Sequence, residues 1–259
     1  MMQSVFRVVS NRPLTGDVFE LRLSGDATTF ERPGQFAEIS VDGFFLRRPI
    51  SVCDWTPDSL LLLVKVVGGG TRMLRELVPG ASLDILTGLG NGFNPRQDVA
   101  ALAQTVLVGG GIGVAPLYAL ARQVVDERIC NGIEAPLPVI LGFRRASEVF
   151  YADEFAALGC RVLIATEDGS RGAKGFVTDI LATEPGLRYV YACGPMPMLR
   201  AVARLPQVGD GQFSFEARMG CGFGACMGCT IATASGPKRV CREGPVFRKG
   251  EIRWEADRR

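Results

Sequence analysis

Residues 105–116 read TVLVGGGIGVAP, an apolar run that leads into a glycine-rich turn and a proline. The apolar run predicts a buried strand, and Pro116 is typical of the first turn of a helix. Glycines let such a turn approach a pyrophosphate closely, and the free N–H groups of the helix N-terminus favour its negative charge. Close packing of a strand against a helix explains the same glycines equally well. The candidate nucleotide contacts of this turn are Gly109, Gly110, Gly111 and Gly113.

The segment that this turn opens alternates between strands and helices. Buried strands are expected at residues 105–108, 138–141, 162–165 and 189–192, and helices at 116–125, 152–158, 177–182 and 196–204. This alternation predicts a doubly wound parallel α/β domain, which we place at residues 98–208. An open sheet of this kind binds ligands at the carboxyl ends of its strands. Because Cys193, Gly194 and Pro195 follow the last strand, they join the glycine-rich turn as candidate nucleotide contacts.

The first part of the chain has a different pattern, with closely spaced strands and few helices. Its expected strands are residues 5–10, 18–23, 36–41, 49–53, 60–67 and 82–86, and the one expected helix is 71–77. Turn residues such as Thr15-Gly16-Asp17 and Pro79-Gly80 separate these stretches. Closely spaced strands with such turns predict an antiparallel β-barrel, which we place at residues 1–97.

Within the barrel, the run Arg47-Arg48-Pro49-Ile50-Ser51 sets a cation and a hydroxyl group three residues apart. A flavin nucleotide needs a cation for its phosphates and a small polar group beside its ring. Lys65 and the pair Gly70-Thr71 are further candidates of the same standing. A solvated arginine and a helix-capping Thr71 are the simpler interpretations of this pattern.

Four of the eight cysteines lie close together near the end of the chain, with the spacing C-x4-C-x2-C-x11-C. They are Cys221, Cys226, Cys229 and Cys241. In plant-type ferredoxins this spacing folds a loop around a [2Fe–2S] cluster, and a later segment supplies the fourth thiolate. Intervening glycines let the backbone curl around a cluster and direct N–H groups at its sulfur atoms. The sequence therefore predicts a small, loop-rich [2Fe–2S] domain at residues 209–259, with brief strands near residues 213–216, 230–233 and 252–254.

Other interpretations of these cysteines stay open. A disulfide framework needs an oxidising compartment, which nothing in the sequence indicates. A zinc site with four cysteines usually has two C-x2-C pairs, and only Cys226 and Cys229 form one here. Coincidence among small-residue turns is the third possibility. The other four cysteines are expected to be small buried side chains.

The composition of the 259-residue chain excludes several classes of function. Without histidine, the chain has no Ser-His or Cys-His nucleophile pair, no histidine-ligated metal and no Rieske-type cluster. A net charge of +2 gives no electrostatic basis for binding nucleic acid. Four glycines and Pro116 interrupt the apolar run at 99–121, which argues against a membrane span. The first ten residues do not resemble a secretory signal, so a cytoplasmic protein without membrane partners is expected.

Together these motifs resemble the ferredoxin–NADP reductase superfamily. Its barrel carries an Arg-x-x-Ser/Thr run, and its α/β domain has a G-G-G-x-G-x-x-P turn and a late C-G-P run. The resemblance covers essentially the whole chain. Within the superfamily, the closest likeness is to the family of electron-transfer subunits of B-type, NAD-dependent dihydroorotate dehydrogenases. It is carried by residues 48–51, 88–93, 166–170, 175–179, 218–229 and 240–247.

The resemblance implies an oxidoreductase subunit of pyrimidine biosynthesis, with FAD, a [2Fe–2S] cluster and NAD as a diffusible acceptor. It implies that FAD is held by Arg48, Pro49, Ile50, Ser51, Leu63, Val64, Lys65, Gly70 and Thr71, and that Cys221, Cys226, Cys229 and Cys241 ligate the cluster. It also implies a catalytic partner subunit with FMN that oxidises dihydroorotate to orotate, in an assembly of two copies of each chain. Ile50 stands where many of these reductases have an aromatic residue that stacks on the flavin.

The preference for NAD over NADP rests on Glu167 and Asp168, which could bond a ribose hydroxyl and repel a 2′-phosphate. Arg171 and Lys174 follow closely and could do the opposite, and all four could be solvated loop charges. Two alternative functions also remain. One is the flavin and iron–sulfur subunit of a hydrogenase or of a ferredoxin:NADP oxidoreductase complex. The other is a zinc-bearing or redox-sensing module on a reductase-like scaffold.

Overall fold

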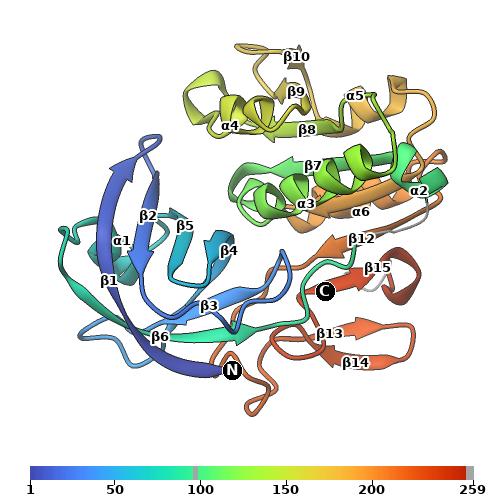
Figure 1. Ribbon diagram of the computed structural model, residues 1–259. Helices are drawn as coiled ribbons and strands as arrows, with labels where there is room; N and C mark the ends of the chain where they lie inside the picture. The colour runs from blue at the N-terminus through green and yellow to red at the C-terminus, as the bar shows by residue number, and fades with distance from the viewer. Residues whose placement is uncertain (96–98, 255–259) are drawn as a thin grey trace.

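The computed structural model describes residues 1–95 and 99–254, which form a barrel, a seven-stranded sheet and a two-stranded hairpin (Figure 1). The expected domain boundary between residues 97 and 98 lies outside these ranges. None of the described helices is long and apolar enough to cross a membrane.

The first part of the chain closes into an antiparallel barrel with the strand order β1-β2-β5-β4-β3-β6. Its strands are β1 (Met2–Pro13), β2 (Val18–Ser24), β3 (Phe36–Ile39), β4 (Arg48–Thr56), β5 (Ser59–Lys65) and β6 (Ser82–Leu89). The barrel is filled by apolar side chains from every strand, among them Phe6, Phe19 and Leu62. Helix α1 (Gly69–Arg75) begins two residues before the expected helix and buries Leu74 in the same core. The predicted barrel is confirmed.

The second part is a parallel sheet with the strand order β10-β9-β8-β7-β11-β12-β15, in which only β15 is antiparallel to its neighbour. Its strands are β7 (Thr105–Gly110), β8 (Pro138–Phe143), β9 (Arg161–Thr166), β10 (Ala173–Lys174), β11 (Tyr189–Cys193), β12 (Asp210–Ser214) and β15 (Val246–Arg248). Its helices are α2 (Val99–Ala103), α3 (Leu117–Cys130), α4 (Ala152–Ala157), α5 (Val177–Thr183) and α6 (Met196–Arg204). Short 3-10 turns span Gly111–Val114, Ala146–Glu148 and Lys249–Glu251. The predicted parallel α/β unit is confirmed.

The sheet continues beyond residue 208, because β12 and β15 extend its edge. The C-terminal segment is therefore built onto the α/β sheet, and it adds the hairpin of β13 (Thr230–Thr233) and β14 (Gly236–Arg239). The strand expected at residues 252–254 is wrong. Ile252 makes one isolated bridge to Thr233, because the 3-10 turn just before it bends the chain.

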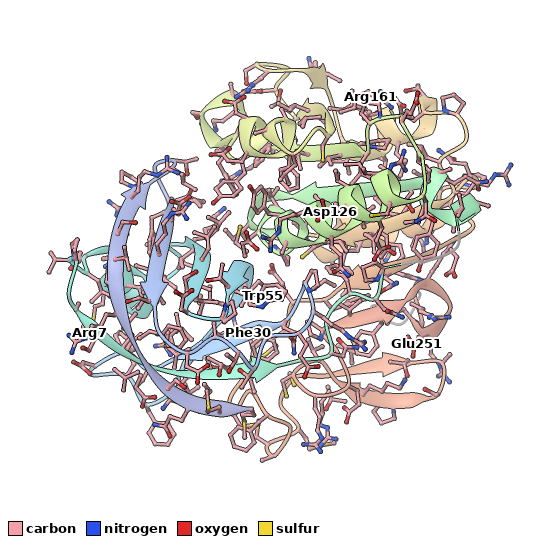
Figure 2. The ribbon with its side chains drawn as sticks, in the orientation of Figure 1. Arg7, Phe30, Trp55, Asp126, Arg161 and Glu251 are labelled. Carbon is pink, nitrogen blue, oxygen red and sulfur yellow. The ribbon has the colours of Figure 1, made fainter. Side chains whose placement is uncertain are left out.

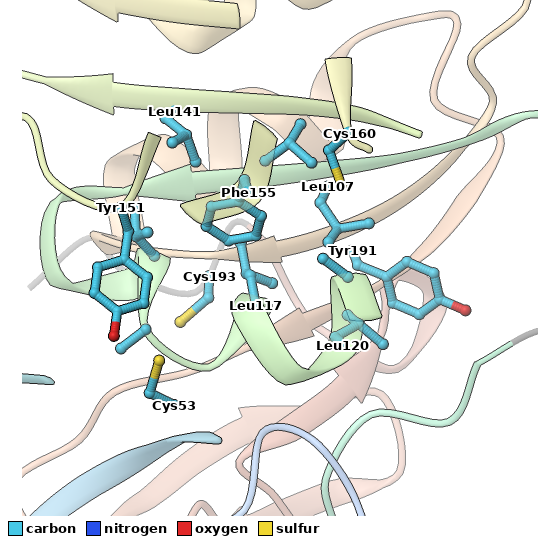
Figure 3. Close-up of a cluster of buried hydrophobic side chains, with 14 of the residues drawn as sticks. Cys53, Leu107, Leu117, Leu120, Leu141, Tyr151, Phe155, Cys160, Tyr191 and Cys193 are labelled. Carbon is cyan, nitrogen blue, oxygen red and sulfur yellow. The ribbon is translucent and has the colours of Figure 1, made fainter. Parts of the chain in front are cut away.

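Two polar contacts join the barrel to the side of the sheet that α3 and α4 cover. The Tyr151 hydroxyl, just before α4, donates to Oε2 of Glu20 on β2 at 2.7 Å. Arg122 on α3 pairs with Asp54 on β4 at 2.6 Å. Figure 3 shows Tyr151 and Cys53 within the hydrophobic cluster that continues from the sheet into this interface. The barrel is thus fixed against α3 and α4.

A third contact joins the barrel to the C-terminal segment through Asn91, which follows β6. Its side-chain amide donates to the carbonyl groups of Val246 at 2.7 Å and Glu243 at 3.0 Å. Its amide oxygen accepts the Val246 N–H at 3.1 Å, and its own N–H donates to the Gly244 carbonyl at 2.8 Å. Four hydrogen bonds at one residue therefore hold the C-terminal segment on the barrel.

Candidate functional site

The barrel, the α/β sheet and the C-terminal segment meet around one cleft of about 290 Å³. Its barrel wall consists of Phe36, Arg48, Pro49, Ile50, Ser51, Leu63, Lys65, Val67 and Thr71. Its other wall consists of Ile112, Ala115, Ser214, Phe215, Glu216, Ala217, Met219 and Pro245. Seven of the nine residues that the resemblance implied for FAD lie on the barrel wall.

Strand alternation decides which residues of β5 face the cleft. Leu63 and Lys65 line it, whereas the side chain of Val64 between them is fully buried in the barrel core. Successive side chains of a strand point to opposite faces, so all three could not face the cleft together. Lys65 pairs with Asp17 at 3.4 Å, which keeps a cation at this end of the cleft.

Arg48, in the barrel wall of the cleft, has close neighbours on two sides. Its guanidinium carbon lies 4.6 Å from the centre of the Phe44 ring, and a Cβ at Gly70 would come within 2.3 Å of its Nε. Gly70 therefore does not line the cleft itself but makes room for the arginine. Thr71 lines the cleft and also caps the helix, because its hydroxyl oxygen accepts the N–H groups of Val67 and Gly68.

Two aromatic residues of the cleft were missed by the sequence analysis. Phe36 on β3 and Phe215 just after β12 both line it, and the Phe215 ring packs edge-on against Phe247. Ile50 has no aromatic ring, and Phe36 and Phe215, which are 3% and 2% exposed, are the aromatic residues found in the cleft lining among the described residues. The apolar residues of the strand expected at 213–216 gave no indication of which ring would face a ligand.

The glycine-rich turn and the Cys193-Gly194-Pro195 run come together at the carboxyl ends of β7 and β11, as expected. Cys193 lies opposite Gly109 in the parallel register, and a Cβ at Gly113 would come within 2.4 Å of the Cys193 carbonyl oxygen. A Cβ at Gly110 would meet Met198 at the same distance. Close packing thus accounts for Gly110 and Gly113. Gly111 has a φ of +53° and open space beside it, and it remains the residue that a ligand can approach.

Cys193 itself is buried, with 2% of its surface exposed. Burial raises the pKa of its thiol well above the usual range, and nearby Glu216 acts in the same direction. The thiol is therefore protonated at neutral pH and is not a nucleophile.

The acidic loop after β9 is exposed. The Asp168 carboxylate accepts hydrogen bonds from the Ser170 N–H at 2.9 Å and the Ser170 hydroxyl at 2.5 Å. The Ser170 hydroxyl oxygen in turn accepts the N–H of Ala146, in the turn after β8, at 2.7 Å. The ends of two neighbouring strands are thereby tied together, with Asp168 held in a fixed position. Glu167, Arg171 and Lys174 are exposed around it.

The four clustered cysteines come together as two pairs. The N–H of Cys226 donates to the sulfur of Cys221 at 3.4 Å, and the N–H of Cys241 donates to the sulfur of Cys229 at 3.4 Å. Across residues 1–95 and 99–254, no three potential ligands converge on one point that could hold a single metal ion. Two pairs of thiols suit two irons with two thiolates each.

The environment of these thiols also fits an iron–sulfur cluster. Burial would raise the pKa of Cys221, but N–H groups that point at its sulfur, including that of Ala225 at 3.2 Å, lower it to about 6. The loop therefore favours a thiolate, the form that binds iron. Burial and the neighbouring Cys229 raise the pKa of Cys241 to about 12, so this thiol must lose its proton when it binds metal.

A buried carboxyl group beside this loop was not anticipated. Glu38 on β3 is fully buried, and neither of its oxygens has a hydrogen-bond partner among the described residues. Arg47, the cation that acts on it most strongly, pairs instead with Asp84 at 2.7 Å. Burial raises the pKa of Glu38 to about 7, against the opposing charge of Arg47. A Cβ at Gly222 would come within 2.3 Å of Glu38 Oε1, so the carboxyl group lies directly against the cysteine loop.

Comparison with known proteins agrees with both the nucleotide-binding part and the cysteine part of this site. Residues 107–204 match the model of the oxidoreductase NAD-binding domain, and residues 216–253 match that of the iron-sulfur cluster binding domain of dihydroorotate dehydrogenase B. A dihydroorotate dehydrogenase B (NAD(+)) electron transfer subunit from Geobacillus sp. (strain WCH70) is 40% identical over 97% of this chain and 99% of its own. A relative of the same description from Listeria monocytogenes is 39% identical over 98% of this chain and all of its own.

Solved structures show the same architecture. The NADH-dependent reduced ferredoxin-NADP oxidoreductase superposes with a TM-score of 0.82 and 28% identity, over 96% of this chain and 90% of that one. An Amycolatopsis cytochrome P450 reductase, at 23% identity, shares the fold with a TM-score of 0.68 over 80% of this chain and 67% of its own. With about 40% identity to its relatives over nearly its whole length, the chain belongs to the family of dihydroorotate dehydrogenase B electron transfer subunits.

Proposed function

We propose that this chain carries FAD in the cleft and a [2Fe–2S] cluster on Cys221, Cys226, Cys229 and Cys241, and that it passes electrons from a catalytic partner to NAD⁺. One observation carries the proposal. Met219 lines the cleft, and the first cluster ligand, Cys221, follows it by two residues. Since consecutive Cα atoms are 3.8 Å apart, the two sites lie within about 8 Å of each other along the backbone.

The cleft supplies what a flavin nucleotide requires. Arg48 and Lys65 would neutralise its phosphates, and Phe36 and Phe215 would pack against its ring. Ser51 would place a hydroxyl group beside the ring edge. When bound, the flavin accepts electrons singly or in pairs and the cluster accepts one at a time, so the two together join a one-electron path to a two-electron acceptor.

NAD⁺ would bind at the carboxyl ends of β7, β9 and β11. Gly111 leaves room for a pyrophosphate at the glycine-rich turn, and Asp168 would bond the ribose hydroxyl groups. The negative charge of Asp168 would repel the 2′-phosphate of NADP. Because Ser170 holds the Asp168 side chain in place, that side chain would not easily turn away. Flavin reduction by NADH should therefore be at least tenfold more efficient than by NADPH. Equal or better reduction by NADPH rejects this assignment.

The partner would be an FMN-containing catalytic subunit that oxidises dihydroorotate to orotate, in an assembly of two copies of each chain in the cytoplasm. The cysteine loop offers the surface for it. Cys226 is exposed, and Phe223 and Met227 beside it are 40% and 54% exposed. Exposed apolar side chains around a ligand loop are typical of a docking surface, and contact there would bring a partner's cofactor close to the cluster.

Anaerobic purification with iron, sulfide and flavin analysis tests the proposal. We expect about two irons, two sulfides and one FAD per chain, together with a copurifying FMN protein that oxidises dihydroorotate. A colourless protein with zinc supports the zinc-module alternative instead. A partner with several clusters, or one with nickel, supports the hydrogenase or ferredoxin:NADP oxidoreductase alternative. The main reason to consider that alternative is the likeness to the solved ferredoxin-NADP oxidoreductase.

A further inference from the structure

The cysteine site is built from two parts of the chain, residues 221–229 and the turn that carries Cys241. Backbone hydrogen bonds hold some of its cysteines more firmly than others. On the buried side, Cys229 and Cys241 lie together, and the N–H of Val240 donates to the Cys229 carbonyl at 3.1 Å. On the exposed side, the glycine-rich stretch from Cys221 to Cys226 has no strand pairing. This stretch needs another tether if it is to hold two thiolates in a fixed position.

Arg239, the last residue of β14, provides such a tether. Its Nη1 donates to the carbonyl oxygen of Gly224 at 2.6 Å, in the middle of the exposed stretch. Its Nε donates to the Glu243 carboxylate at 3.0 Å, and Nη2 donates to the other carboxylate oxygen. The rigid guanidinium group thus spans both segments, with Glu243 fixing its orientation.

The backbone of Arg239 is the centre of the turn that carries Cys241. Its carbonyl oxygen accepts the N–H groups of Arg242 at 3.2 Å, Glu243 at 3.0 Å and Gly244 at 3.3 Å. Its own N–H donates to the Glu243 carboxylate at 2.7 Å. Both the turn and the reach of the side chain to Gly224 therefore depend on this residue.

We propose that Arg239 is a positioning residue of the cluster site, which fixes the Cys221–Cys226 stretch relative to Cys241. The inference rests on the proposed cluster. The simpler explanation is an ordinary surface ion pair, because the side chains of Arg239 and Glu243 are 25% and 31% exposed. Such pairs contribute little to stability and would not affect metal retention.

The chain offers a matched control in the pair of Arg161 and Glu184. It is another bidentate ion pair, with side chains 44% and 20% exposed. Arg161 lies at the top of Figure 2, far from the hairpin at the bottom of Figure 1, which is drawn in the same orientation. Arg161→Gln therefore removes an equivalent surface contact without touching the cysteine loop.

The test compares the anaerobically purified wild-type chain with Arg239→Gln, Arg239→Lys and Arg161→Gln. Arg239→Gln should release iron to a chelator about tenfold faster than Arg161→Gln, as expected for the loss of a charged hydrogen bond. The electron paramagnetic resonance signal of its reduced cluster should also broaden. Arg239→Lys keeps the positive charge but cannot donate to Gly224 and Glu243 together as the guanidinium group does. Its rate of iron release should therefore fall between those of Arg239→Gln and Arg161→Gln. Far-ultraviolet circular dichroism and flavin content should stay unchanged.

If Arg239→Gln does not fold, Glu243→Gln replaces it, because it removes the anchor of the guanidinium and should also speed iron release. Iron release from both variants at the rate of Arg161→Gln overturns the inference while leaving the proposed function intact. A wild-type chain without iron and sulfide overturns the proposed function as well.

Discussion

The Tyr151 hydroxyl donates a 2.7 Å hydrogen bond to Oε2 of Glu20 and thereby connects the α/β sheet to the barrel. Glu20 is 3% exposed and also pairs with Arg12 at 3.0 Å. Burial alone would raise the pKa of Glu20, but the hydrogen bonds from Tyr151 and Arg12 lower it overall. Tyr151 holds a φ of +63°, which is rare for a residue with a side chain, so the surrounding packing must stabilise this backbone conformation.

Tyr151→Phe should therefore lower the free energy of unfolding by about 1.5–3 kcal/mol, because a buried carboxylate loses a donor. Chemical denaturation followed by tryptophan fluorescence measures this difference. Tyr118→Phe is the control, since Tyr118 packs edge-on against the Tyr151 ring and no hydrogen bond of its hydroxyl is found among the described residues. Equal losses in the two variants would contradict the role of the hydrogen bond.

Glu38 should make the stability of the chain depend on pH. Its pKa is raised to about 7 in the folded chain from an ordinary value near 4.5. Between these values the folded state binds more protons than the unfolded state, so stability falls as the pH rises from about 4.5 to 7. The total loss is on the order of 3 kcal/mol.

The variant Glu38→Gln cannot ionise and should escape this loss. Thermal unfolding of the wild type and of Glu38→Gln between pH 4.5 and 8 measures the difference in stability between them. The advantage of Glu38→Gln over the wild type should grow up to about pH 7 and then level off. An advantage that is constant across this range would show that the carboxyl group does not titrate as described.

Gly222 and Gly43 have the same φ of +75° but different surroundings. A Cβ at Gly222 would come within 2.3 Å of Glu38 Oε1, whereas nothing lies within 4 Å of one at Gly43. Gly43→Ala should cost about 1–2 kcal/mol of stability from backbone strain alone. Gly222→Ala should cost more and also reduce the iron content, because it displaces the loop after Cys221.

The double variant Glu38→Ala/Gly222→Ala removes the contacted carboxyl group. It should therefore recover most of the iron that the single Gly222→Ala variant loses. Iron and sulfide analysis measures this recovery. If Gly222→Ala and Gly43→Ala retain the same iron content, contact between Glu38 and the loop has no effect on the cluster site.

Cys226 and Cys130 are both exposed, so the expectation of a buried side chain is wrong for Cys130, and only Cys226 belongs to the cluster motif. Cys226→Ser should abolish most of the visible absorption of the cluster and at least half of the iron, since serine is a poor ligand for iron–sulfur clusters. Cys130→Ser should retain both. Loss of iron from the two variants to the same extent would remove the assignment of Cys226 as a ligand.

The sequence predicted those parts of the fold that depend on local patterns. Alternating and apolar runs gave the barrel strands and the parallel strands, and helix α6 has the expected bounds of residues 196–204. Strand β14 was missed because Gly236 and Pro237 disfavour strands, yet it pairs with β13 as an edge strand. Strand β15 has three residues and depends on its pairing with β12, which a local pattern cannot reveal.

The same distinction holds for the site. Cys221 and its three companions were found because ligand spacing in a loop is a local property. Glu38 was missed because its role depends on burial against Gly222, far away in the sequence. Phe215 was likewise hidden, since only the meeting of the barrel and the sheet places it in the wall of the cleft.

The four hydrogen bonds of Asn91, together with the attachment of β15 to the sheet, have a consequence for the speed of the reaction. They anchor the cysteine segment to both neighbouring domains and so fix its position relative to the cleft. The gap that an electron must tunnel across is set when the chain folds. Turnover therefore need not wait for a domain to shuttle back and forth between its donor and its acceptor.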